Sequence, residues 1–576
     1  STNQIFFLTF VTLKLIETKN QIIMNKRFAI MVILATMAAL SISSCGNKKG
    51  TEKKAEAVDS MKLKVDEYAT VKLTADLSKL SEKEKEMLPY LFEAAQIMDD
   101  IYWLQTYGDN KKTLDSIKDE NVKKFFMINY GPWDRLNDNK SFINGIGTKP
   151  AGANFYPKDM TKEEFDALKD ENKKSQYTVI RRNEDKSLKV VWYHDEYKEQ
   201  LQKASDLILK ASSLAENKEF KTYLELTAKA LLSSDYFKRD MAWMNMRGSN
   251  IDFVCGPTEN YEDALFGIKT AFEAFVLIKD MDWSSKLDKF SKLLPTLQKQ
   301  LPCEDKYKKE VPALGSDMGV YEAVFYRGDC NAGSKTIAIN LPNDEKVQLK
   351  KGSRKLQLKN AMKAKFDNMV VPIANLLITE KQRKNVKFES FFQNTMFHEV
   401  AHGMGIKNTL TKKGTVREAL GEGYSAIEED KADITGLFLA KKLHEMGELT
   451  EGEVMDNYVT FVAGIFRSIR FGTASAHGKA NLARYNFLMS KGAITRDAKG
   501  FYTVDFDKMT KAMEELVGMI LKTQGEGDKN AAIKYISDNG KKTKELTEDL
   551  SKIANANIPR DIVFEQGLEV LGLKKK

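Results

Sequence analysis

The sequence FESFFQNTMFHEVAHG, residues 388–403, predicts a helix that ends in a pair of histidines. A helix turns once in about 3.6 residues, so His398 and His402 lie on one face, where two imidazoles can hold a zinc ion. Glu399 then stands where a carboxylate can take a proton from a metal-bound water. Gly403 favours a stop just after the second histidine. The stretch therefore predicts a metal site with a base beside it, and an accidental pair on a core helix is the alternative.

A catalytic zinc ion usually has three protein ligands and a water molecule, so a third ligand is required. The HExxHxxGxxH pattern would supply a third histidine, but Asn408 stands at that position. A following helix could supply a carboxylate instead, and IEEDKAD, residues 427–433, offers Glu428, Glu429 and Asp433. Glu429 and Asp433 lie on a stripe of small residues that would allow close packing. We predict one Zn²⁺ per chain, held by His398, His402 and one of these carboxylates. The alternative for IEEDKAD is an acidic helix start favoured by the helix dipole.

The imidazoles of such a site need partners for their second ring nitrogens. Zinc-bound histidines usually donate that N–H to a carboxylate or carbonyl, which fixes the tautomer. Glu418 and Glu428 are the first candidates for this role, and Asp433 is the third.

Three motifs together, HEVAHG, EEDKAD and RFGTASAHGKAN, resemble the dipeptidyl-peptidase III family of zinc exopeptidases. Most members have a six-residue HExxGH motif, and this chain has the five-residue form. The resemblance covers about residues 130–570. It implies a predominantly helical α+β fold with two lobes and a cleft between them. The zinc ion would be held by His398, His402 and Glu429 on the helical lobe, and the other lobe would be smaller and contain the β-structure.

The resemblance also implies roles for residues outside the zinc motif. Tyr261 and His477 would stabilise the developing oxyanion, and Glu259, Asn340 and Asn343 would bind the free amino terminus of a peptide. A hydroxyl donor lowers the barrier to a developing oxyanion, and a carboxylate pairs with an ammonium. The residues alone leave other interpretations open: a half-buried aromatic for Tyr261, turn residues for the asparagines and an exposed loop for His477.

The amino-terminal region predicts export and lipid anchoring. Met24 is followed by a basic segment and by an apolar run, residues 28–42, that is too short to span a bilayer comfortably. Residues 42–45 resemble a bacterial lipoprotein signal, in which Cys45 would be lipidated. We predict an exported protein attached through Cys45 to a bacterial membrane, facing the periplasm or the cell surface. A transmembrane anchor is the alternative.

The chain is predicted to have five segments. Residues 1–44 would be upstream sequence plus signal peptide, and residues 45–57 a charged tether. Residues 58–360 would form mainly an N-terminal mixed α/β lobe that binds the peptide amino terminus. Residues 361–555 would form the helical zinc-binding lobe, and residues 556–576 a closing segment that returns to the other lobe.

Local signals add detail to the first lobe. Ser81 with Glu84, and Thr161 with Glu164, match the capping-box pattern of a helix start. Two β-rich runs within residues 177–194 predict a hairpin.

Composition excludes few classes of protein. Hydrophobic residues make up 42% of the chain and charged residues 30%, which is ordinary for a globular protein. The net charge of +9 is small for 576 residues, and no basic cluster with interleaved aromatics indicates nucleic acid as a partner. The sequence does not indicate an oligomeric state.

The predicted function is a zinc-dependent aminopeptidase-type hydrolase that releases dipeptides from the amino termini of short peptides. One alternative is a zinc peptidase of other end-specificity, or an endopeptidase. The other is a non-catalytic surface lipoprotein that binds peptides, although a binding protein has no use for Glu399.

Overall fold

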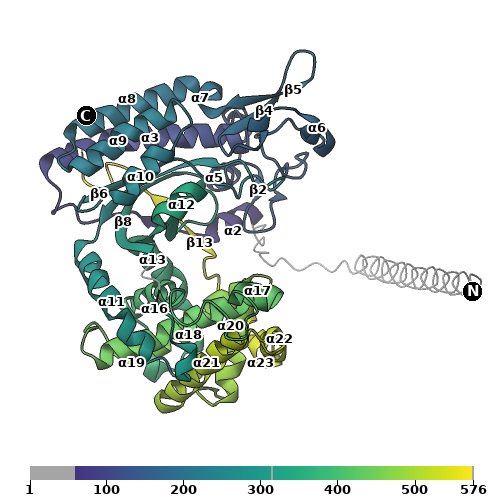
Figure 1. Cartoon of the computed structure of the whole chain (residues 1–576). Coiled ribbons are helices and arrows are strands. Elements are labelled where there is room, and N and C mark those ends of the chain that lie inside the picture. The colour runs from purple at the N-terminus through teal and green to yellow at the C-terminus, as the bar shows by residue number, and fades with distance from the viewer. Residues whose placement is uncertain (1–58, 313–315, 574–576) are drawn as a thin grey trace, which may run out of the picture. The chain divides into compact units, whose positions relative to one another are not determined.

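The structure, a computed structural model, describes residues 59–312 and 316–573, without the side chains of Ser316 and Asp317. Ser60–Lys576 forms one compact unit (Figure 1). The predicted signal peptide, the tether and Cys45 lie outside the described residues. Within the described ranges, no helix combines the length and apolar character needed to cross a membrane.

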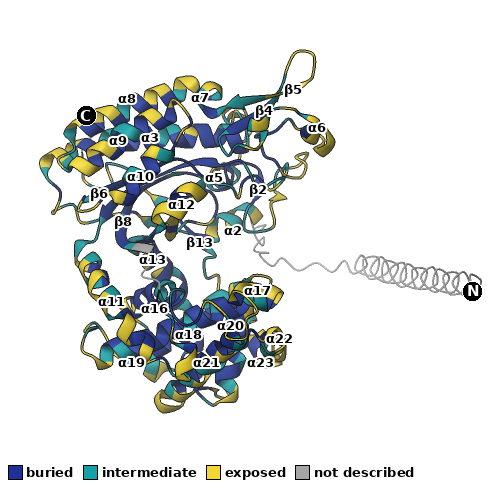
Figure 2. Ribbon diagram, in the orientation of Figure 1, coloured by how far each residue is buried: buried dark blue, intermediate teal, exposed yellow. Residues whose placement is uncertain are grey.

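Buried apolar side chains form two large cores, which define two lobes (Figure 2). The core of the first lobe draws on residues 73–278 and 321–361. The core of the second lobe draws on residues 283–320 and 362–553. The protein is thus mainly helical α+β with two lobes, which confirms the predicted fold class, although the core of the sheet-containing lobe is not the smaller of the two.

A five-stranded sheet forms the centre of the first lobe. Neighbouring strands are antiparallel except for the parallel pair β8 and β10. The strand order is β6 (Ile251–Glu259), β7 (Ala271–Lys279), β8 (Ser316–Gly328), β10 (Ser353–Leu358) and β9 (Ala338–Leu341). β6 and β7 are buried on both faces up to their last residue, so their sequences lack a two-residue alternation. At the sheet edge, Asn340 of β9 lies opposite Lys355 of β10.

Helix α3 (Glu82–Thr106) packs against β7, β8 and α8 (Lys198–Leu214). It begins at the predicted capping box, in which Ser81 and Glu84 each accept a hydrogen bond from the other's backbone N–H. The predicted hairpin is also present, as β4 (Thr178–Arg182) and β5 (Leu188–Trp192). The other elements of this region are α2 (Ser60–Asp66), α4 (Lys111–Ser116), α5 (Glu120–Asn129), β2 (Trp133–Asp134), β3 (Lys140–Ser141), α6 (Lys162–Ala167), α7 (Tyr193–Glu196), α9 (Lys218–Leu231), α10 (Phe237–Asn245) and α12 (Glu345–Lys351).

Helix α18 (Tyr424–Glu445) is buried along most of its length in the second lobe. It packs against α16 (Phe388–Ala401), α19 (Val454–Ile469), α20 (Ala476–Ser490) and α21 (Phe506–Glu526). The remaining elements are α13 (Lys359–Lys365), a π-helical turn (Phe366–Val370), α14 (Val371–Leu377), α15 (Glu380–Arg383), α17 (Val416–Leu420), β11 (Ile494–Arg496), β12 (Tyr502–Val504), α22 (Lys529–Asp538) and α23 (Lys544–Asn555).

Helices α16 and α18 approach closely at Gly436. A Cβ atom built there would lie 2.7 Å from the backbone nitrogen of His398, so only glycine allows this spacing. The small residues expected on this helix face therefore do bring the two helices together. Glu429 lies seven residues before Gly436, two turns away on the same face, which places it beside the histidines.

The chain passes between the lobes several times. Helix α11 (Met281–Lys299) lies inside the segment predicted for the first lobe, yet Leu287, Phe290, Leu294 and Leu297 belong to the second core. Their spacing places them on one helix face, and the second lobe covers that face. The chain end returns to the first lobe, where β13 (Asp561–Glu565) pairs in parallel with β1 (Tyr68–Lys72). Each lobe is therefore assembled from separated segments.

Candidate metal centre and active site

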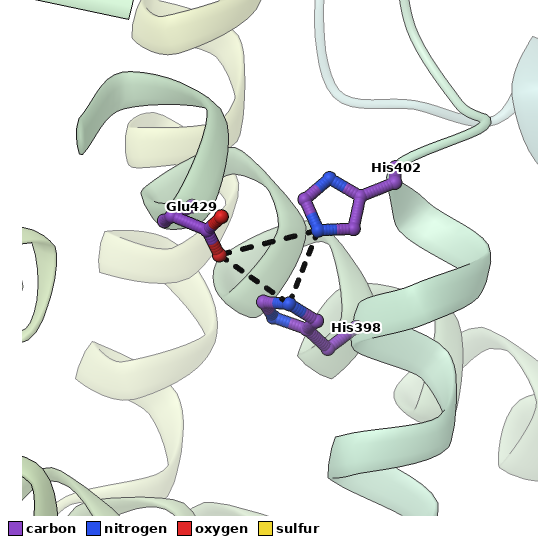
Figure 3. Close-up of side chains that lie close together, drawn as sticks. All are labelled: His398, His402 and Glu429. Atoms are coloured by element: carbon purple, nitrogen blue, oxygen red, sulfur yellow. Dashed lines mark hydrogen bonds and ion pairs between the residues drawn. The ribbon is translucent and has the colours of Figure 1, made fainter. Parts of the chain in front are cut away.

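Three side chains from two helices converge on one point (Figure 3). The Nε2 atoms of His398 and His402 lie 3.2 Å apart. Glu429 Oε2 lies 3.5 Å from the first Nε2 and 4.0 Å from the second. A tetrahedral zinc ion with bonds of about 2.0–2.2 Å holds its ligands about 3.3–3.5 Å apart. The spacing therefore fits zinc after sub-ångström adjustment.

The same group contains a polar atom that a metal would satisfy. Glu429 Oε2 is buried and lies 3.1 Å from His477 Nδ1, but none of the residues that the structure describes donates a well-formed hydrogen bond to it. A buried carboxylate oxygen without a hydrogen bond is costly, and a metal ion held between this oxygen and the imidazoles would offset that cost. Two imidazoles and one carboxylate are also a donor set of catalytic zinc sites.

The second nitrogen of each imidazole faces a carboxylate. His398 Nδ1 lies 2.6 Å from Asp433 Oδ1, and His402 Nδ1 lies 2.9 Å from Glu428 Oε1. With Nδ1 donating, each Nε2 presents its lone pair toward Glu429. The structure thus places Glu428 and Asp433 where the sequence analysis expected such partners.

Glu418 lies elsewhere, which corrects its expected place among those partners. Its carboxylate accepts hydrogen bonds from the backbone N–H and the hydroxyl of Thr415, and Thr415 Oγ1 accepts one from Glu418 N. This capping box starts α17 and occupies the carboxylate.

Each of the two supporting carboxylates is bound in turn by a buried cation. Arg484 Nη2 lies 2.7 Å from Asp433 Oδ2, and Lys431 Nζ lies 2.9 Å from Glu428 Oε1. Burial alone would raise the pKa of Glu428, but Lys431 and the hydrogen bond from His402 hold it at about 2. Arg484 similarly keeps the pKa of the buried Asp433 low. Both carboxylates therefore stay ionised, as the donating imidazoles require.

Glu399 follows the first histidine and meets a residue of the other lobe. Lys355 Nζ on β10 lies 2.7 Å from Glu399 Oε2. Burial alone would raise the pKa of Glu399, but Lys355 and the neighbouring histidines hold it below its ordinary value. The candidate base is thus ionised and tied to the strand that pairs with Asn340.

His477 comes from the start of α20 and reaches the same point. Its Nδ1 lies 3.1 Å from Glu429 Oε2, and its side chain is 61% exposed. The turn before it is tight, because a Cβ at Gly478 would lie 2.4 Å from the carbonyl oxygen of Gly472. His477 is therefore held beside the metal residues while its ring remains open to solvent.

The residues expected to bind a peptide amino terminus form a second group on the first lobe. Glu259 ends β6, and the amide of Asn343 donates to the carbonyl of Thr258 at 2.9 Å. Burial raises the pKa of Glu259, while a hydrogen bond from Asn343 opposes that shift. Tyr261 is 82% exposed, and no hydrogen bond joins it to the metal residues within the described ranges. Asn340 is exposed on β9 and connects the two groups through its pairing with Lys355.

The loop after Glu259, which carries Tyr261, is anchored by Glu262, a residue that was not predicted from the sequence. Glu262 is 3% exposed and pairs with Arg135 at 2.9 Å and with Lys149. Burial alone would raise the pKa of Glu262, but the two cations hold it at about 2. The position of Glu262 directly after Tyr261 was the one feature of the sequence that could have indicated this role. Its partners Arg135 and Lys149 lie more than a hundred residues earlier in the chain.

Two cavities meet at Glu399. One of about 800 Å³ lies on the His402 side and is lined by Met244, Arg247, Lys355, Lys407 and the apolar face of α11. The other, of about 600 Å³, lies on the His398 side and is lined by Ala338, Gln357, His398, Arg467 and His477. Both volumes are in the range of small-molecule and peptide sites, about 300–1,000 Å³. A bound peptide could thus extend on both sides of the candidate base.

Comparisons with known proteins agree with this geometry. Residues 96–417 match the family model described as Peptidase family M49. The chain is 36% identical to Nudix hydrolase 3 of Arabidopsis thaliana, with 87% of this chain and 73% of that protein covered. It is 24% identical over 226 residues to Dipeptidyl peptidase 3 of Nematostella vectensis, covering 34% of this chain and 30% of that protein.

Two solved structures are similar over most of the chain. DPP III from Caldithrix abyssi matches with a TM-score of 0.83 and 39% identity, over 88% of this chain and 99% of that chain. DPP III from Corallococcus sp. strain EGB matches with a TM-score of 0.70 and 36% identity, over 88% and 96%.

Proposed function

This chain belongs to peptidase family M49, and from that membership we propose that it is a zinc-dependent peptidase that releases dipeptides from the amino termini of short peptides. The likeness to two DPP III structures supports the same activity. The observation that carries the proposal is the convergence of His398, His402 and Glu429 with Glu399 beside them.

The positions of Glu259, Asn340 and Asn343 relative to Glu399 support dipeptide release. Asn343 lies three residues from Asn340, at most about 11 Å along an extended chain. Asn340 pairs with Lys355, whose ammonium reaches Glu399. A peptide held by its amino terminus at Glu259 and Asn343 would therefore present an early peptide bond to the base.

Glu399 performs the proton transfers in this proposal. Zinc held by His398, His402 and Glu429 supplies Lewis acidity toward a carbonyl and toward water. Glu399, ionised beside Lys355, accepts the proton of the attacking water and delivers it to the leaving amine. Asp433 and Glu428 keep the imidazole N–H groups on Nδ1 throughout.

Tyr261 and His477 supply donors for the negative charge that develops on the carbonyl oxygen. The Tyr261 hydroxyl is exposed, and the His477 ring is open to solvent beside Glu429. Removing one donor of this kind typically costs about 10²–10³ in kcat.

Product mass spectrometry on a defined octapeptide tests the proposal, with the zinc-loaded protein and Glu399→Ala compared side by side. We expect stepwise dipeptides from the amino terminus, reduced about 10²–10⁴-fold in Glu399→Ala with zinc still bound. Internal cuts would replace the dipeptide claim by an endopeptidase. No cleavage at all with one zinc bound would leave a peptide-binding protein.

We also propose that Cys45 carries a lipid that anchors the exported chain to a bacterial membrane. The support is the sequence of residues 28–45. Expression of wild type and Cys45→Ser in a bacterial host, followed by membrane fractionation and intact mass, tests it. Equal membrane association and unlipidated mass in both would rule the anchor out.

A further inference from the structure

Arg467 on α19 is a partly buried cation for which the described residues supply no hydrogen bond or ion pair. Its Nε atom is buried and unpaired, and no hydrogen bond or ion pair to Arg467 occurs in the part of the chain that the structure describes. A guanidinium that is partly taken out of water normally recovers the cost through hydrogen bonds to an anion. An unpaired guanidinium beside a cavity therefore indicates a missing anionic ligand.

The surroundings of Arg467 carry an excess of positive charge. Arg470 and Arg560 lie nearby, and burial together with Arg467 and Arg560 lowers the pKa of Arg470 to about 10. Asp561 attracts Arg467 electrostatically, but this carboxylate is already bound by Lys365 at 3.1 Å and by the hydroxyl of Ser334. The local field thus favours an additional negative charge.

Arg467 lines the 600 Å³ cavity on the His398 side of the candidate base. The cavity reaches the sheet at Ala338 and Gln357, which pair with each other. Ala338 begins β9, and Asn343 follows the other end of that strand. A peptide that starts at Asn343, follows β9 and passes Glu399 would continue into this cavity. The part of the peptide beyond the cleaved bond would then approach Arg467.

We propose that Arg467 forms a carboxylate-binding subsite for the part of the substrate beyond the cleaved bond. This inference rests on the proposed function for the direction of the peptide. The guanidinium fork matches a carboxylate with two parallel hydrogen bonds, and Arg470 and Arg560 strengthen the attraction. The carboxylate can be the free carboxyl terminus of a short peptide or an acidic side chain. Either source makes Arg467 a determinant of substrate choice.

A set of four pentapeptides separates the two sources. One has a free carboxyl terminus and neutral side chains, and the second is its amide. The third and fourth are amides with Glu or Gln at the fourth residue. Dissociation constants are measured with the zinc-loaded Glu399→Gln protein, and KM and kcat with the protein that retains Glu399. Arg467→Gln and Arg467→Lys are compared with Lys511→Gln, which removes one exposed charge from α21.

We expect amidation of the carboxyl terminus, or replacement of Glu by Gln, to weaken binding and raise KM about tenfold, as loss of a charge-assisted hydrogen bond would. Arg467→Gln should remove this difference, Arg467→Lys should keep part of it, and Lys511→Gln should leave it intact. The more sensitive pair of peptides identifies the source of the carboxylate.

Equal affinity for all four peptides in the protein with Arg467 would overturn the subsite, and this comparison needs no substitution at Arg467. A carboxylate preference that survives Arg467→Gln would also overturn it. Failure of the proposed function looks different, since no dipeptide would then be released from any peptide whatever the binding constants.

Discussion

Asp433 and Glu428 hold the two histidines in the tautomer and orientation that a metal needs, and a buried cation holds each carboxylate. The imidazoles are therefore oriented before any ion binds, which lowers the cost of assembling the site. The support comes from α18 and α20, so the ligand geometry depends on helices beyond the one that carries the motif.

Asp433→Asn should weaken zinc binding about 10–100-fold, because the His398 N–H loses its anionic partner. Competition with a chromophoric chelator measures the affinity, and a melting curve checks that the fold survives. Glu418→Gln is the matched control, since that carboxylate caps α17, and its zinc affinity should stay unchanged. An equal loss in both variants would contradict the assigned support.

Lys355→Met should lower kcat about tenfold while zinc affinity stays constant. The ammonium fixes one oxygen of Glu399, and a charge-assisted hydrogen bond of this kind is worth about 1.5–3 kcal/mol. Steady-state kinetics on a dipeptide-releasing substrate measures kcat, and Lys355→Arg should restore part of it. A variant with unchanged kcat would show that Glu399 needs no partner on β10.

Glu262→Gln should change the acid stability of the protein. The pKa of Glu262 is about 2 in the folded state against an ordinary value of 4.5. Its contribution is complete above about pH 4.5 and is lost as the pH falls toward 2, and it amounts to about 3 kcal/mol. Urea titrations should therefore show a shallower loss of stability between these pH values in the variant. Identical slopes would argue against a charged Glu262 in the fold.

Among whole elements, the contact between α16 and α18 depends on Gly436. In Gly436→Ala the new methyl group must displace the backbone at His398, which should cost about 1–3 kcal/mol and weaken zinc binding. Gly464→Ala on α19 is the matched control, since a Cβ there meets nothing within 4 Å. That change should stabilise the helix by about 0.5–1 kcal/mol. Thermal melts with and without zinc compare the two, and a harmless Gly436→Ala would contradict the close approach.

The sequence predicted elements whose signals are local. The capping box at Ser81, the hairpin within residues 177–194 and the helix of the histidine motif all follow from spacing or end chemistry. The five-stranded sheet was not predicted from the sequence, because β6 and β7 are buried on both faces and show no alternation of apolar and polar residues.

The residues of the candidate site also differ in whether a local sequence pattern could predict them. His398 and His402 are four residues apart on one helix, so their pairing could be predicted from spacing. Glu429 lies on the later helix α18, and its selection among the carboxylates of residues 427–433 depended on the family resemblance. Lys355 is separated from Glu399 by 44 residues and a change of lobe. No local pattern records such a contact, and the same holds for Glu262 with its partners.

For the molecule as a whole, the division into lobes does not follow the order of the chain. Helix α11 belongs to the second core, although residues on both sides of it build the sheet of the first lobe. Amphipathic periodicity predicted that such a helix buries one face, but it could not indicate which lobe covers that face.

Leu297→Ala should therefore destabilise the second lobe by about 2–5 kcal/mol, because its side chain is 1% exposed in that core. Hydrogen exchange should rise in α16 and α18 more than in α3. Leu91→Ala, in the first core, is the matched control with the opposite pattern. Faster exchange of the first lobe in Leu297→Ala would contradict the assignment of α11.

The pairing of β1 with β13 has a consequence for biosynthesis. Tyr68–Lys72 leaves the ribosome nearly five hundred residues before its partner strand Asp561–Glu565 exists. During that interval β1 has an unpaired edge, which a chaperone or another nascent chain could occupy. Translation that stops shortly before residue 561 would yield a chain with both lobes nearly complete and β1 unpaired. Such a chain would be a target for quality-control proteases.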